Sequence, residues 1–153
     1  MSRRVIAIDL GTRRIGVAIT DALGVAALPH ATIARHGGKR DLDAIAAVVR
    51  EVDARLVVLG LPLDPDGHDG ELVEGRAAKS ARTFAERLRG ALSVPVELVD
   101  ESFSTVEANE VLLAADLSRA RRKEVVDRVA AAVILRRWLD AHGKSDPSLE
   151  GGS

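Results

Sequence analysis

The chain has 153 residues, of which 46% are hydrophobic and 29% charged, and its 22 basic residues nearly balance 23 acidic ones. This length fits one globular domain with a sizeable core. This balance of charge excludes a strongly basic protein whose whole surface is positive, so any contact with nucleic acid must come from local basic patches. Disulfides and thiolate chemistry are excluded because the chain has no cysteine. No apolar run approaches membrane-spanning length, and we expect a cytoplasmic protein without a membrane partner.

The first part of the chain predicts three strands that short turns connect. The apolar run 5–8 ends in the carboxylate of Asp9, and a turn centred on Gly11 leads into a second apolar run. The expected strands cover residues 4–10, 15–20 and 25–33, the last at a sheet edge because it contains Pro29.

The remainder of the chain predicts alternating helices and strands. Residues 41–52 carry apolar side chains at helical spacing, and "RLVVLG" at 55–60 is a continuous apolar run typical of a central parallel strand. Residues 61–75 are rich in Pro, Gly and Asp and predict a long loop. The further elements expected are a helix at 74–89, a strand at 94–99 and helices at 105–115 and 119–142.

An antiparallel meander followed by helix–strand–helix–strand–helix predicts a five-stranded mixed sheet flanked by helices. This α/β arrangement is that of a ribonuclease H-like domain, expected here over residues 1–142. The tail, residues 143–153, lacks core-forming side chains and is predicted to be disordered. Because one fold hosts many activities, function must be argued from the site.

Three acidic residues occupy positions that indicate one shared site. Asp9 ends the first strand and Glu101 follows the last, so both are expected at the edge where open α/β sheets form their functional crevice. Asp127 lies on the core-facing side of the final helix, as its spacing from the apolar stripe shows. That stripe consists of Ala130, Ala131, Ile134, Leu135 and Trp138.

Converging carboxylates repel one another and resist ionisation, and hard divalent cations such as Mg²⁺ or Mn²⁺ relieve that repulsion. A pair of such ions can activate water for phosphodiester cleavage. The alternative is that each acid pairs with an arginine, because buried acids are usually paired. Asp9 has Arg13 and Arg14 nearby in sequence, and Asp127 has Arg122 and Arg128.

Four motifs in order resemble those of the YqgF/RuvX family, namely "IDLGTRRIGVAITD", "VLGLPLDPDG", "VDESFST" and "RKEVVDRVAAAVILRRWLD". The resemblance covers nearly the whole chain apart from the tail. It implies a ribonuclease H-like fold and an activity described both as Holliday junction resolution and as nucleolytic maturation of the 5′ end of pre-16S ribosomal RNA. It also implies that Asp9, Glu101 and Asp127 match the acidic triad of the family.

One position departs from the family pattern, because Ser102 stands where the family commonly has arginine. We expect other cations to hold substrate phosphate in its place. The candidates are Arg14 and the cluster Arg121, Arg122 and Lys123, which lies about one helical turn before Asp127. Such contacts would position a nucleic-acid backbone without reading its bases. The alternative interpretation of the cluster is a solvated helix start.

Other functional classes are less well supported. The opening hairpin also resembles the phosphate-holding turn of actin-like and sugar-kinase folds, but these need two lobes and this chain has length for one. A non-catalytic nucleic-acid or transcription-complex adaptor would be favoured by loss of the triad, yet all three acids are present. The residues leave open whether structured RNA or branched DNA is the partner. A resolvase acting on a two-fold symmetric junction would require a homodimer.

Overall fold

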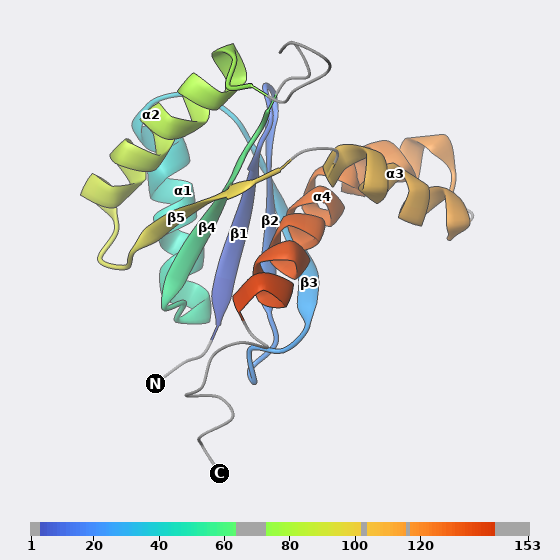
Figure 1. Cartoon of the computed structure of the whole chain (residues 1–153), viewed down its shortest axis with the longest axis horizontal. Coiled ribbons are helices and arrows are strands. Elements are labelled where there is room, and N and C mark those ends of the chain that lie inside the picture. Colours follow the sequence, from blue (N-terminus) through green and yellow to red (C-terminus); the bar gives the residue numbers. More distant parts are fainter. Residues whose placement is uncertain (1–3, 64–72, 102–103, 116, 143–153) are drawn as a thin grey trace.

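A five-stranded mixed sheet forms the centre of the structure, a computed structural model that describes residues 4–63, 73–101, 104–115 and 117–142. Its strand order is β3-β2-β1-β4-β5, with β1, β2 and β3 antiparallel and β4 and β5 parallel to β1 (Figure 1). This confirms the predicted sheet. The strands are β1 (Val5–Leu10), β2 (Arg14–Thr20), β3 (Ala27–Ala34), β4 (Leu56–Leu61) and β5 (Val96–Asp100).

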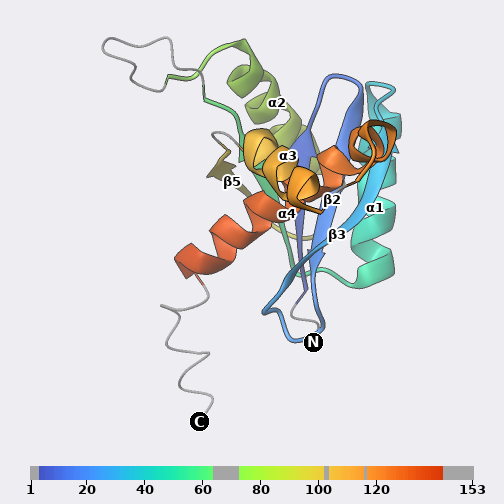
Figure 2. The same cartoon turned by 90° about the vertical axis from the view of Figure 1, so that its right-hand side faces the viewer.

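Helices cover both faces of this sheet. α1 (Lys39–Val52) and α2 (Arg76–Ala91) lie on one face, and α4 (Arg119–His142) crosses the other (Figure 1). α3 (Ser104–Ala114) packs on α4, which it crosses in Figure 2, and it projects away from the sheet in Figure 1. No helix within the described residues is long and apolar enough to cross a membrane.

The alternation of side chains along β1 determines which layer each residue joins. Ile6 and Ile8 are buried in the core against α1 and α2, whereas Val5 and Ala7 are buried in the core against α4. Because strand side chains alternate between faces, Asp9 belongs to the α4 face. Asp9 is therefore covered by α4 although it lies near the end of its strand, and only 7% of the residue is exposed to solvent.

The apolar stripe predicted on the final helix is confirmed. Its alanine pair lets α4 lie close to the sheet, and its larger side chains fill the core between them. At the end of the stripe the indole Nε1–H of Trp138 donates to Glu97 Oε2 at 2.9 Å. The buried residues of the stripe are Ala130, Ala131, Ile134, Leu135 and Trp138.

The predicted element boundaries differ from the observed ones by a few residues. The last strand begins at Val96 and not at position 94, because Pro95 has no N–H to donate; its carbonyl accepts the Val57 N–H at 3.0 Å instead. Some predictions fall outside the described residues, namely those for the middle of the 61–75 loop (residues 64–72), for Ser102 and for the tail at 143–153.

α4 approaches the sheet very closely at Gly16. A Cβ atom placed on Gly16 would lie 1.9 Å from the backbone oxygen of Asp127 and 2.9 Å from the Arg128 nitrogen. No real side chain fits at such distances, so the absence of a side chain at Gly16 lets the helix backbone rest directly on β2.

Replacing Gly16 with alanine should therefore destabilise the fold by pushing α4 off β2. We expect a cost of about 1–3 kcal/mol, the usual range for overpacking a core. That corresponds to a fall in Tm of roughly 2–4 °C per kcal/mol for a chain of this size. Thermal unfolding followed by circular dichroism measures it.

Gly90→Ala is the matched control, since Gly90 lies in α2 and a Cβ atom placed on it would have nothing within 4 Å. Alanine there should leave Tm unchanged or raise it, because glycine in a helix costs about 0.5–1 kcal/mol relative to alanine. Equal Tm values for the two variants would contradict the close approach at Gly16.

Candidate active site

Asp9 and Glu101 come together across β4 at the carboxyl edge of the sheet. β1, β4 and β5 run parallel, so their carboxyl ends share one edge, and the Glu101 N–H donates to the Leu61 carbonyl at 3.0 Å. Between them lies Gly60, where a Cβ would stand 2.9 Å from Glu101 Cγ and 3.0 Å from Glu101 Oε2. The Glu101 side chain thus occupies the space above Gly60 and extends toward β1.

The carboxyl of Asp9 is electrostatically strained in this position. Burial raises its pKa from 3.8 to about 8, reinforced by the Glu101 charge, by a hydrogen bond with the Glu101 carboxyl and by the Asp127 charge. Two carboxyls can share a hydrogen bond only when one carries a proton, so a proton holds this pair together near neutral pH. A cation placed between them would do the same without protonation.

Asp127 is held beside the pair by the contact between α4 and Gly16. Its Oδ2 accepts a hydrogen bond from Arg14 Nε at 2.6 Å, in an ion pair whose side chains are 39% (Arg14) and 19% (Asp127) exposed. Proximity in sequence had suggested Arg13 or Arg14 as the partner of Asp9, and Arg122 or Arg128 as that of Asp127. The structure instead joins Arg14 to Asp127, which orients this carboxylate toward the opening hairpin.

The three acids suit a hard divalent cation by their chemistry, because all the donors are carboxylate oxygens. Within the described part of the chain, however, no three His, Cys, Asp or Glu side chains are grouped in a way that could hold a metal ion. Instead, Asp9 and Glu101 hydrogen-bond each other, and Asp127 forms an ion pair with Arg14. The roles of the acids as metal ligands and catalytic residues stay a prediction.

The cationic cluster lies at the start of α4. Ser118 precedes this helix as its N-cap and accepts the Arg121 N–H through its hydroxyl at 3.2 Å. Arg121 and Lys123 are exposed, and Arg122 is half-buried. The cluster therefore leads into the turn that carries Asp127, with two of its side chains open to solvent.

The turn after Asp9 is braced by a residue that sequence reasoning did not single out. Arg35 Nη1 donates to the Gly11 carbonyl at 2.6 Å, and the Gly11 N–H donates to the Arg14 carbonyl at 2.9 Å. Arg35 itself lies 4.0 Å from the buried carboxylate of Asp41, which also accepts the His36 N–H at 2.9 Å. This network fixes the hairpin that connects Asp9 to Arg14.

Sequence reasoning also missed two glycines of the site, Gly16 and Gly60. Each interrupts an otherwise apolar strand, and such a glycine signals that another backbone or side chain approaches closely. Asp9 lies directly opposite Gly16 in the β1–β2 pairing. A glycine inside each of these apolar strands was therefore the sequence signal that could have revealed the close approach.

Comparisons with known proteins agree with this architecture. A family model described as "RuvX: Holliday junction resolvase" matches residues 3–141. A "Putative pre-16S rRNA nuclease" of Myxococcus xanthus (strain DK1622) is 50% identical over 143 residues, which cover 94% of this chain and 91% of that protein. The protein of the same name from Syntrophomonas wolfei is 42% identical over 137 residues, covering 90% of this chain and 94% of its own.

Among solved structures, a Fowlpox virus resolvase in complex with Holliday junction DNA aligns with a TM-score of 0.52 and 9% identity, covering 90% of this chain and 97% of the resolvase. This likeness concerns the ribonuclease H-like fold alone. The family is shown by the match over residues 3–141 and by relatives 42–50% identical over at least nine tenths of the chain. The chain therefore belongs to the RuvX family and is, by homology, a nuclease with a ribonuclease H-like fold.

Proposed function

We propose that this nuclease is a metal-dependent phosphodiesterase that processes the 5′ end of pre-16S ribosomal RNA. Asp9, Glu101 and Asp127 would hold the metal, Mg²⁺ or Mn²⁺, as a pair of ions. The observation that carries this proposal is the buried, hydrogen-bonded pair of Asp9 and Glu101, with Asp127 close enough to raise the pKa of Asp9 further. The names of the relatives supply the RNA substrate, which would place the protein in the cytoplasm.

When bound, the metal pair would activate a water molecule and stabilise the leaving oxygen. The residues of the chain itself perform the other tasks. Asp9 and Glu101, which share a proton in the absence of metal, would supply carboxylate oxygens as its ligands, and burial would keep bulk water from competing for these oxygens. Arg14 holds the Asp127 carboxylate toward the hairpin through their ion pair. Arg121, Arg122 and Lys123 bind phosphates of the substrate and position its backbone.

A second candidate function is the resolution of four-way DNA junctions, and the description of the family model favours it. A junction is two-fold symmetric, so this activity would require a homodimer with one acidic site in each subunit. A non-catalytic adaptor with the same fold is a further alternative, which measurable cleavage would exclude.

A parallel cleavage assay separates these functions. The protein is incubated with a pre-16S RNA leader and with a four-way DNA junction, each with Mg²⁺, with Mn²⁺ and with excess chelator. We expect metal-dependent cleavage of the RNA at the 5′ end of the 16S sequence. Symmetric cleavage of the junction alone would support the resolvase, and full activity in chelator would rule out the metal mechanism for either substrate.

Asp9→Asn should abolish cleavage and stabilise the metal-free protein above neutral pH. The pKa of Asp9 is raised on folding from 3.8 to about 8, so the native state loses stability as pH rises through this interval. An asparagine has the same shape, can donate to Glu101 and does not ionise. The variant should therefore show a higher Tm than wild type at pH 8–9, roughly 2–4 °C for each kcal/mol of relieved strain, and little difference near pH 4.

The exposed Asp43→Asn on α1 is the matched control and should change neither cleavage nor the pH profile of Tm. Added Mg²⁺ should raise the Tm of wild type more than that of Asp9→Asn, because an ion that binds only the folded state stabilises it by mass action. A strongly destabilised Asp9→Asn protein, with wild type indifferent to Mg²⁺, would show that Asp9 is structural.

Neutralising Arg121, Arg122 and Lys123 to glutamine should weaken RNA binding without changing the metal requirement of cleavage. Each phosphate that is no longer bound should lower the slope of log affinity against log salt by about 0.7 for single strands. Filter binding at a series of salt concentrations measures the slope. An unchanged slope would assign the cluster to solvation.

A further inference from the structure

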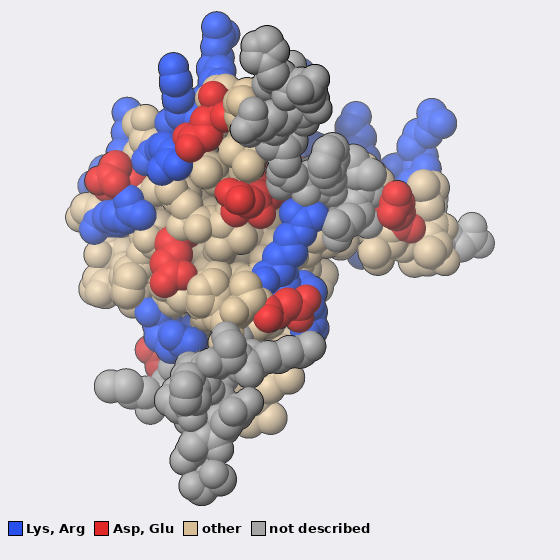
Figure 3. All heavy atoms as spheres, in the orientation of Figure 1, with Lys and Arg blue, Asp and Glu red and all other residues tan. Residues whose placement is uncertain are grey.

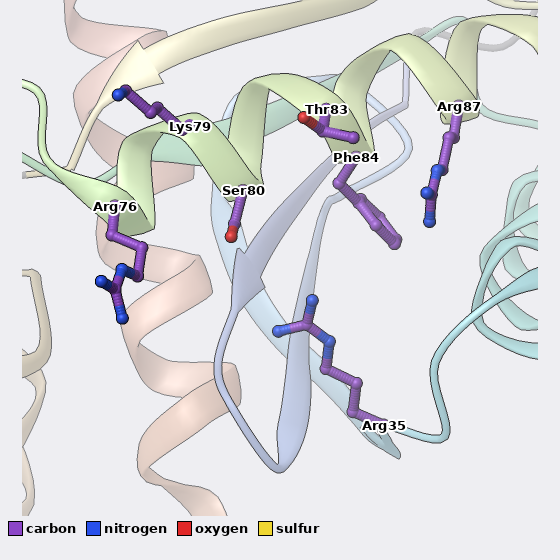
Figure 4. Close-up of a pocket in the computed structure, with 7 residues that line it drawn as sticks. All are labelled: Arg35, Arg76, Lys79, Ser80, Thr83, Phe84 and Arg87. Atoms are coloured by element: carbon purple, nitrogen blue, oxygen red, sulfur yellow. The ribbon is translucent and has the colours of Figure 1, made fainter.

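A basic groove runs between α2 and Arg35, the residue that follows β3, on the face of the sheet opposite α4. Its volume is about 370 Å³, and we call it the α2 groove. Figure 4 shows Arg76, Ser80 and Arg87 of α2 pointing to the side on which Arg35 lies, with Lys79 at the rim. The lining residues are Arg35, Arg76, Lys79, Ser80, Thr83, Phe84 and Arg87.

Most cations of this groove lack counter-charges within the described part of the chain. α2 carries five basic residues and one acid, Glu86, in a chain whose net charge is −1. Glu86 is paired with Arg89, and Glu74, just before the helix, is paired with Arg82. Among the described residues no ion-pair partner exists for Arg76, Lys79 or Arg87, and Figure 3 shows basic side chains projecting over α2.

The placement of two of these cations is unfavourable for the helix itself. Arg76 and Lys79 lie in the first turn of α2, which contains no acid. The helix N-terminus carries partial positive charge, so acidic side chains stabilise this turn and basic ones destabilise it. A bound anion would neutralise both the partial positive charge of the helix N-terminus and the charges of the basic side chains. Residues that oppose a local stability rule in this way are often functional.

The groove and the acidic cluster meet at the same end of the sheet. Arg35, which lines the groove, donates to the carbonyl of Gly11, two residues beyond Asp9. α2 also begins at this end, because it follows the carboxyl end of β4. A nucleic-acid strand whose phosphate lies at Asp9 could therefore pass the hairpin turn and reach the α2 groove on the other face.

We propose that the α2 groove is a second binding site for the phosphate backbone of the nucleic-acid substrate, engaging nucleotides beyond the point of cleavage. This rests on the proposed nuclease function. Arg76 and Arg87 are eleven residues apart on one helix and span about 16 Å, more than one phosphate occupies. The aromatic ring of Phe84 is buried and offers no platform for a base, so the groove suits a polymer backbone better than a mononucleotide.

A site-directed crosslink tests the location directly, and the absence of cysteine from the chain allows it. Ser80→Cys places one thiol in the groove, and Ser93→Cys, exposed in the loop after α2, is the matched control. With a photoactivatable crosslinker attached, the inactive Asp9→Asn protein should crosslink a pre-16S RNA leader through position 80 and not through position 93. Equal crosslinking at both positions, or none at 80, would overturn the proposal.

A charge-matched pair of variants tests the energetics. Arg76→Gln with Arg87→Gln should lower the salt slope by about 1.4 for a long single-stranded RNA, at about 0.7 for each phosphate that is no longer bound. Affinity for a short RNA that covers only the cleavage point should be unchanged. Arg40→Gln with Arg50→Gln removes the same charge from exposed positions of α1 and should have no effect on either RNA.

These outcomes distinguish the groove from the proposed function. A protein that binds long RNA through the groove but cleaves nothing would leave the groove proposal intact and remove the nuclease assignment. Competition by inorganic phosphate alone, with equal affinity for long and short RNA, would identify a small-anion site. Equal losses of RNA affinity in the α1 and α2 variants would indicate an effect of overall charge only. Binding to an acidic protein but not to RNA would identify a different partner. The small-anion, overall-charge and acidic-protein outcomes each contradict the proposal.

Discussion

The cost of burying carboxylates at the carboxyl edge of the sheet is the constraint on which the site depends. Asp9 is 7% exposed and has Glu101 and Asp127 as its neighbours, so burial and repulsion act together to raise its pKa. A fold selected for stability alone would place an apolar side chain here or provide a buried cation as partner. Instead the Asp9 carboxyl hydrogen-bonds a second acid. Sites that retain such strain are usually the ones that bind a ligand or perform chemistry.

Two glycines near Asp9 make this arrangement possible, because they have no side chains to fill the space around it. Gly16 and Gly60 lie on the strands to either side of β1, both on the α4 face. The first admits the backbone of α4, which brings Asp127 to the sheet. The second leaves room for Glu101 to lie across β4. Because neither glycine contributes chemistry, their role is purely spatial, and a single methyl group at either would displace a carboxylate or its supporting helix.

The buried acids and the basic α2 groove lie on opposite faces of the sheet. The acids gather on the α4 face with Arg14 as a bridge to the hairpin, while the basic side chains of the α2 groove lie on the other face. A protein with nearly zero net charge can attract a polyanion only if its cations are concentrated in this way. The hydrogen bond from Arg35 to the Gly11 carbonyl connects the α2 groove to the turn that follows Asp9, and it fixes the position of that turn.

Local pattern was sufficient to predict the elements and the faces they bury. The apolar run before Asp9 is continuous, as expected of a strand buried on both faces, and the stripe ending at Trp138 follows the helical period of 3.6 residues; both patterns reflect backbone geometry alone. The partners of individual side chains could not be read in this way. Arg14 is adjacent in sequence to the Asp9 hairpin, yet it binds Asp127, 113 positions away. That pairing, and the groove that Arg35 forms with α2, depend on how α4 and α2 cross the sheet, which is decided by close packing between distant segments.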